Sequence, residues 1–276
     1  MVPENTNAAA ALVVTGGGRG IGAQIALRAA RAGAPVALIY RSRSDDASRV
    51  VGEIEKAGGR AIAIAADIGH EADVRRAFQA VDDTFGSLGG LVNNAVFAGE
   101  PARLAELRIE ELESVFRTNV FGAFLCSREA VNRLSTKNGG SGGGIVMLSS
   151  VVAIKTGAPG TWVHFSASKG AVETLSLGLA KEVAAEGIRV NIVRCGVIAT
   201  ETRLTQDQDY LSRAFGPGSD GTDGGPGRGR RHRALAVVGG LVVRDRSHDR
   251  RRGRAVDKGS LRRVLTGILA PEPPSA

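Results

Sequence analysis

Near the start of the chain stands Val13-Val14-Thr15-Gly16-Gly17-Gly18-Arg19-Gly20-Ile21-Gly22, a glycine-rich turn between a short apolar run and a segment of helical period. Glycines let a backbone turn sharply and come close to a ligand. The first backbone N–H groups of the following helix lack partners within the helix, and the positive end of its dipole favours an anion. The stretch therefore predicts a site for the pyrophosphate of a dinucleotide at the end of the first strand.

Outward from this turn, short apolar runs rich in β-branched residues alternate with longer helical segments. The expected strands are 12–15, 36–40, 61–65, 91–93, 145–149 and 189–193. The expected helices are 21–31, 46–57, 71–85, 109–134 and 166–186. This alternation predicts a single-domain α/β fold with a doubly wound parallel sheet of Rossmann type, whose ligand crevice lies beyond the carboxyl ends of the strands.

Length and composition restrict the class of protein. A chain of 276 residues, 43% of them hydrophobic, can bury one sizeable core. Because there is no apolar run of membrane-spanning length and no secretion signal at the start, we expect a cytoplasmic protein without a membrane partner. Cys126 and Cys195 fall in an expected helix and at a strand end, so buried thiols are favoured over a disulfide, and no metal site is expected.

The net charge of +8 comes from one part of the chain. Residues 214–263 contain twelve Arg and one Lys against five Asp, which equals the whole net charge and leaves the main body neutral. A basic tail that binds nucleic acid is one interpretation. Because the segment has no interleaved aromatic residues and no helical or strand period, we expect no nucleic-acid partner.

The end of the second strand bears on cofactor choice. It reads Tyr40-Arg41-Ser42-Arg43, without a carboxylate, and Arg19 in the glycine-rich turn adds a third positive charge. A site for NAD usually places an acidic side chain there for the ribose, whereas the 2′-phosphate of NADP requires cations. The pattern favours NADP(H) over NAD(H), with ordinary surface arginines as the alternative.

The spacing Thr15-Gly16-x-x-x-Gly20-x-Gly22 resembles the fingerprint of the short-chain dehydrogenase/reductase family, and the resemblance extends over residues 8–212. Later motifs in the same order are Asp67-Ile68, Asn93-Asn94-Ala95, Thr118-Asn119-Val120, Leu148-Ser149-Ser150 and Ser166-Ala167-Ser168-Lys169-Gly170. Val96 stands where the family has a glycine, so the backbone there is expected to be shifted. The resemblance implies an NADP(H)-dependent oxidoreductase that transfers a hydride between nicotinamide and a carbonyl or alcohol.

The resemblance also implies the residues of the site. Those that would bind the cofactor are Thr15, Gly16, Arg19, Gly20, Ile21, Gly22, Arg41, Ser42, Asp67, Ile68, Asn93, Ala95, Lys169, Gly196, Ile198 and Thr200. Those at catalytic positions are Asn119, Ser150, Phe165 and Lys169. Phe165 stands where the family has its tyrosine.

Phe165 removes the group that gives a proton to the substrate oxygen in this family. There the Tyr hydroxyl is the acid, the Lys lowers its pKa and binds the ribose, the Ser polarises the carbonyl, and the Asn holds a water of the proton relay. A phenyl ring has no proton to give, so we expect weak turnover with cofactor binding retained. His164 is a less favourable substitute acid, because it lies about 100° further round the helix. An engineered change, a single-codon change and a lapsed enzyme all account for Phe165.

Two departures from the family pattern lie beyond residue 193. Cys195 replaces the proline of a Pro-Gly turn that covers the nicotinamide, and we expect a packed thiol there, with a redox nucleophile as the alternative. Residues 213–276 form an atypical Gly/Arg-rich segment, which we expect to be poorly ordered and without the family's seventh strand. The family's ending Trp-Leu-Ala-Ala-Ser-Ser-Tyr-Val-Thr-Gly, written in GC-rich codons and read one frame out, gives the sequence of residues 238–246. We hypothesise a slip of the reading frame between about residues 212 and 229.

Two functional hypotheses follow. The first is an oxidoreductase of weak activity on a small carbonyl or alcohol, and the second is a catalytically lapsed dinucleotide-binding protein that acts as a sensor or assembly partner. The family assembles through helices that correspond to residues 119–134 and 166–186 and through its last strand. With that strand apparently lost, we expect a homodimer at most and no tetramer.

Overall fold

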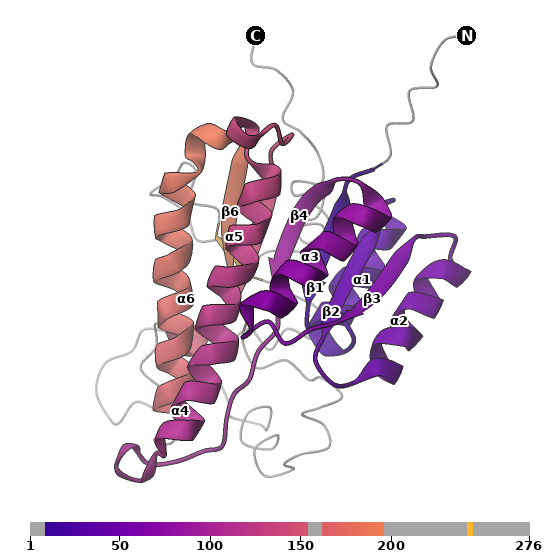
Figure 1. Ribbon diagram of the computed structural model, residues 1–276. Helices are drawn as coiled ribbons and strands as arrows, with labels where there is room; N and C mark the ends of the chain where they lie inside the picture. Colours follow the sequence, from indigo (N-terminus) through magenta and orange to yellow (C-terminus); the bar gives the residue numbers. More distant parts are fainter. Residues whose placement is uncertain (1–8, 154–161, 196–241, 245–276) are drawn as a thin grey trace, which may run out of the picture.

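The computed structural model describes residues 9–153, 162–195 and 242–244 (Figure 1). Six strands form a parallel sheet, and they are Ala11–Thr15 (β1), Val36–Tyr40 (β2), Ala61–Ala65 (β3), Leu88–Asn93 (β4), Gly143–Ser150 (β5) and Ile188–Cys195 (β6). A short strand, Val242–Arg244 (β7), pairs antiparallel with β6, and the order across the sheet is β3-β2-β1-β4-β5-β6-β7. The predicted doubly wound sheet of a single Rossmann-type domain is confirmed.

Helices cover both faces of this sheet (Figure 1). They are Gly20–Arg31 (α1), Ser44–Lys56 (α2), Glu71–Phe85 (α3), Ile109–Phe116 (α4), Gly122–Leu134 (α5) and Val163–Glu182 (α6). Short 3-10 turns span Leu104–Glu106 (η1), Thr136–Asn138 (η3), Val151–Ala153 (η4) and Ala184–Glu186 (η5). Within the described ranges, no helix combines the length and apolar character needed to cross a membrane.

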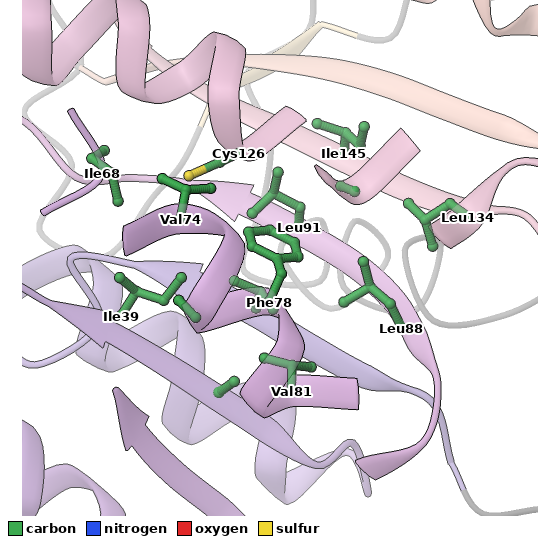
Figure 2. Packing of buried hydrophobic residues seen from close by; sticks show 14 of the residues in the cluster. Ile39, Ile68, Val74, Phe78, Val81, Leu88, Leu91, Cys126, Leu134 and Ile145 are labelled. Atoms are coloured by element: carbon green, nitrogen blue, oxygen red, sulfur yellow. The ribbon is translucent and has the colours of Figure 1, made fainter. Parts of the chain in front are cut away.

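The core forms two layers, one on each side of the sheet. Successive side chains of a strand point to opposite faces, so Val13 joins a cluster with α3, α5 and α6, whereas Leu12 joins a cluster with α1 and α2. Figure 2 shows Phe78 of α3 within the first cluster, beside Leu91 of β4. Phe78 is fully buried, and truncating such a side chain to Ala costs about 3–5 kcal/mol. These two layers hold the carboxyl ends of the strands in place.

Two features differ from the sequence predictions. The single helix expected over 109–134 is divided by a π-helical turn, Arg117–Phe121 (η2). At its end, a Cβ on Gly122 would lie 2.6 Å from Ile68 Cδ1, so a glycine is needed where the helix approaches the loop after β3. The sequence also predicted no strand beyond β6, and this was wrong at β7, which pairs with residues 192–194 of the edge that we expected to be open.

Candidate active site

The glycine-rich turn connects β1 to α1 at the point where the strand order reverses, with β2 on one side of β1 and β4 on the other. Gly16 and Gly20 adopt φ angles of 63° and 54°, which favour glycine. A Cβ on Gly22 would collide with the carbonyl oxygen of Gly16. Helix α1 begins without a side-chain cap and without an acidic residue in its first turn. Its N-terminus therefore suits the pyrophosphate of a dinucleotide.

Thr15 and Asn94 fasten this turn to the end of β4. Thr15 Oγ1 accepts the N–H groups of Asn94 and Ala95, each at 3.0 Å, and Asn94 Nδ2 donates to the Thr15 carbonyl at 2.9 Å. Asn93, the asparagine that we assigned to the cofactor, is buried, and its Nδ2 donates to Ser127 Oγ of α5 at 3.0 Å. Sequence reasoning did not single out Asn94. The alternation of side chains along β4 could have separated the two asparagines.

Three arginines lie at the same edge of the sheet as the glycine-rich turn. Arg19, Arg41 and Arg43 are all exposed, and they follow the adjacent strands β1 and β2. The guanidinium of Arg41 lies 6.0 Å from the centre of the Phe97 ring. Arg43 Nη1 is 3.9 Å from the Asp46 carboxylate, a distance at which an exposed ion pair is weak. Ser42 is also exposed. This edge can offer cations and a hydroxyl to a phosphate.

Asp67 and Ile68 follow β3 and have different surroundings. Asp67 Oδ1 accepts the N–H of Gly69 at 2.9 Å, and the Asp67 N–H donates to Asp73 Oδ2 at 3.0 Å. Ile68 is buried against Gly122. Asp67 is therefore the polar member of the pair, and Ile68 is its buried apolar member.

Lys169 occupies the centre of the candidate catalytic group. It is buried on α6, and its Nζ donates to the carbonyl oxygen of Leu148 in β5 at 2.8 Å. Burial lowers the pKa of Lys169 to about 8. Phe165 lies one helical turn earlier, half-buried, with its ring edge-on to Trp162 at 6.5 Å between centres. Ser150 ends β5, and its Oγ accepts the N–H of Val152 at 3.4 Å.

Asn119 lies in the π-helical turn and acts as a clamp. Its Oδ1 accepts the Phe97 N–H at 2.8 Å, and its Nδ2 donates to the Phe97 carbonyl and to Ser168 Oγ, both at 2.9 Å. Ser168 Oγ in turn donates to the carbonyl oxygen of Phe165 at 2.7 Å. Both amide protons of Asn119 are thus used within the protein. The clamp joins the segment after β4 to the turn of α6 that carries position 165.

A small cavity of about 10 Å³ lies between these segments. Its lining includes the predicted residues Thr15, Ile68, Asn93, Ala95, Asn119 and Lys169, but neither Ser150 nor Phe165. Asn93 Oδ1 is buried and has no hydrogen-bond partner among the described residues. The volume is near the lower limit for one water molecule, and the lining offers the polar partners that a buried water requires. The structure therefore brings six predicted residues from separate segments to one point.

Other predicted residues lie apart from this point. Gly196, Ile198 and Thr200 lie outside the described residues. His164 is buried, and within the part of the chain that the structure describes neither of its ring nitrogens is hydrogen-bonded. Its Nε2 lies 3.0 Å from where a Cβ on Gly99 would be. Both cysteines are free thiols, and burial raises the pKa of Cys126 to about 12 and that of Cys195 above its ordinary range.

Comparisons with known proteins agree with this geometry. A family model described as short chain dehydrogenase matches residues 10–211. The Escherichia coli protein "Uncharacterized oxidoreductase YgfF" is 49% identical over 189 residues, which are 68% of this chain and 76% of that protein. The Arabidopsis thaliana "NADPH-dependent aldehyde reductase-like protein, chloroplastic" is 38% identical over 68% of this chain and 72% of its own. A Burkholderia cenocepacia short chain dehydrogenase in complex with NADP superimposes with a TM-score of 0.64 and 37% identity, covering 70% of this chain and 76% of that one.

Proposed function

Because this chain belongs to the short-chain dehydrogenase family of oxidoreductases, we propose that it transfers a hydride between NADP(H) and a carbonyl or alcohol substrate. The observation that carries the proposal is the meeting of Thr15, Asn119 and Lys169 at one cavity beside the glycine-rich turn. Polar groups from distant segments that converge at the carboxyl edge of a parallel sheet are typical of an active site.

Each side chain has a role that its position supports. The nicotinamide supplies or accepts the hydride when the cofactor is bound. Ser150 donates a hydrogen bond to the substrate oxygen, and the Lys169 ammonium stabilises negative charge near that oxygen. Phe165 leaves the site without its acid, and general acid catalysis is worth roughly 10²–10⁴-fold. We therefore propose slow turnover, in which a water near Lys169 and Asn119 gives the proton.

The choice of NADP(H) over NAD(H) rests on charge. Arg19, Arg41 and Arg43 place three cations at the edge where the adenosine ribose would lie, and α2 contributes no carboxylate before Asp45. Charge-assisted hydrogen bonds to a 2′-phosphate are about twice as strong as neutral ones. Two similar proteins have names that mention NADPH or NADP, which supports the same choice.

The assembly and the last segment are further parts of this proposal. Phe121 and Phe124 expose 57% and 52% of their surface at the start of α5, and Leu177 of α6 exposes 43%. Large apolar side chains on two neighbouring helices favour a homodimer. The family model ends at residue 211, close to where the Gly/Arg-rich segment begins, and this agrees with a slip of the reading frame between about residues 212 and 229. Sequencing the gene tests that hypothesis, and a cytoplasmic location stays a prediction.

The second candidate function is a dinucleotide-binding protein without turnover, and Phe165 is the observation that favours it. One pair of measurements separates the two. NADPH is titrated by the fluorescence of its reduced ring, and its oxidation is then followed with a panel of aldehydes and ketones, with Lys169→Ala as the control. Turnover above this control supports the oxidoreductase. Binding without turnover favours the sensor, and an absence of NADPH binding contradicts both.

A further inference from the structure

A buried carboxylate outside the predicted site joins the elements that carry it. Glu173 lies four residues after Lys169 in α6, hence one turn further along the same face of the helix. It is 7% exposed. Its Oε1 accepts hydrogen bonds from Ser149 Oγ at 2.8 Å and Arg194 Nε at 2.6 Å, and its Oε2 accepts one from Arg194 Nη2 at 2.5 Å. Helix α6 is thereby bound to β5 and β6 through one side chain.

Ser149 and Arg194, which bond this carboxylate, each come directly before a residue of interest. Ser149 precedes Ser150 at the end of β5, and Arg194 precedes Cys195 at the end of β6. Ser149 and Arg194 are also register partners in the parallel pairing of the two strands. Paired residues of neighbouring strands point to the same face of a sheet, here the face that α6 covers. Each of the two strands is thus bonded to Glu173 through its penultimate residue.

The chemistry of the contact makes it directional. A guanidinium that bonds both oxygens of a carboxylate admits a narrow range of orientations. The hydrogen bonds that Arg194 donates to Glu173 raise the pKa of Arg194 above its ordinary value, so the guanidinium stays charged. Since α6 also carries Lys169 and position 165, rotation or sliding of α6 against the strands would move those groups relative to Ser150. This two-pronged contact between Arg194 and Glu173, the fork, opposes both movements.

We propose that Glu173 is a positioning residue for hydride transfer, which fixes the placement of Lys169 relative to Ser150 and to the end of β6. This inference rests on the proposed function, because it assigns a catalytic consequence to the contact. Glu173 acts through Ser149 and Arg194 and does not touch the substrate. If the contact were purely stabilising, its loss would lower the free energy of unfolding and leave the geometry of the folded site unchanged.

The test uses the full chain and two readouts, of which one needs no turnover. The first is the rate at which Cys195 reacts with an aromatic disulfide reagent, which reports the end of β6, since Cys126 is fully buried. The second is kcat for ketone reduction in the Phe165→Tyr background, with the Kd for NADPH measured alongside. The variants are Glu173→Gln and Arg194→Lys, and Glu182→Gln, at an exposed position of the same helix, is the matched control. Folding of each variant is checked by circular dichroism.

Arg194→Lys is the decisive variant, because it retains both charges and removes only the fork. We expect its Cys195 to react at least about fivefold faster than in the control, and kcat to fall by about tenfold or more, since small misplacements of reacting groups can cost up to about a hundredfold. The Kd for NADPH should change by less than about threefold. Glu173→Gln should behave in the same way.

The outcomes separate this inference from the proposed function. A thiol rate in Arg194→Lys within about twofold of the Glu182→Gln control overturns the positioning role, whether or not kcat falls. A faster thiol with an unchanged kcat also overturns it, because the strand end would then have moved without catalytic effect. If the Phe165→Tyr background itself shows no turnover, the proposed function fails on that result. The thiol rates then still decide whether Glu173 positions the strand end.

Discussion

Replacing Phe165 with tyrosine should raise carbonyl reduction at least about a hundredfold. The position is already held where the chemistry requires it, because Ser168 Oγ donates to the Phe165 carbonyl at 2.7 Å and Asn119 donates to Ser168 at 2.9 Å. Lys169 follows one helical turn later. The ring is half-buried and meets Trp162 edge-on, so the change adds one hydroxyl to a side chain that is already placed.

The magnitude depends on the charge of Lys169. Burial lowers the pKa of Lys169 to about 8, so the ammonium form predominates at pH 7. The ammonium lowers the pKa of a neighbouring phenol, which brings the new hydroxyl toward the working range of an acid. A hundredfold gain corresponds to about 2.7 kcal/mol of barrier. Because the ammonium loses its proton as the pH rises through about 8, the gain should decrease above that pH.

The assay compares the parent and the Phe165→Tyr variant with one panel of ketones and NADPH in excess, followed by cofactor absorbance. Phe124→Tyr is the matched control, because it adds the same hydroxyl at an exposed position of α5. The substitution should raise kcat and leave the Kd for NADPH unchanged, since a proton given in the transition state contributes little to ground-state binding. If the variant binds NADPH and reduces nothing faster than the parent, the reasoning is refuted. The defect would then lie at Cys195 or after residue 212.

Three other predictions concern the cofactor, pH and assembly. NADPH should bind at least about tenfold tighter than NADH, or about 1.4 kcal/mol, and Arg41→Ala should remove much of the difference; equal Kd values in the parent would contradict this. The pKa of Lys169 falls on folding from 10.5 to about 8, so the unfolded chain binds more protons between these values and stability should rise with pH across that window. Relative to the Lys169→Met variant, the free energy of unfolding of the parent should rise by about 3 kcal/mol across this pH window. Urea unfolding at several pH values measures it, and the same pH dependence in parent and variant would exclude the prediction. The protein should be a dimer at most that Phe121→Asp dissociates, and light scattering that finds a stable tetramer would disprove this.

Much of the fold could be predicted because its signals are local. The β-branched runs and the helical periods gave six strands in the right places, and the glycine spacing put the turn between β1 and α1. The spacing of Lys169 from position 165 predicts that both lie on one helical face. Such predictions succeed because period and spacing within an element determine which side chains share a face. The three-residue β7 has no such period, and it was missed.

What remained undetermined were the contacts between segments far apart in the chain. Two adjacent asparagines have the same chemistry, yet Asn94 fastens the glycine-rich turn and Asn93 faces the interior. Asn119 was expected to hold a water, and the structure uses its amide to clamp Phe97 to α6. The sequence did not distinguish Glu173 from the other charged residues of its helix. The structure makes it the junction of α6, β5 and β6, because Ser149 and Arg194 of the neighbouring strands bond its carboxylate. The sequence by itself determined the elements and most of the residue types at the site, because neighbours in the chain interact whatever the fold. The tertiary structure alone decided which polar atoms meet, because a partner more than twenty residues away is chosen by the order and register of the sheet.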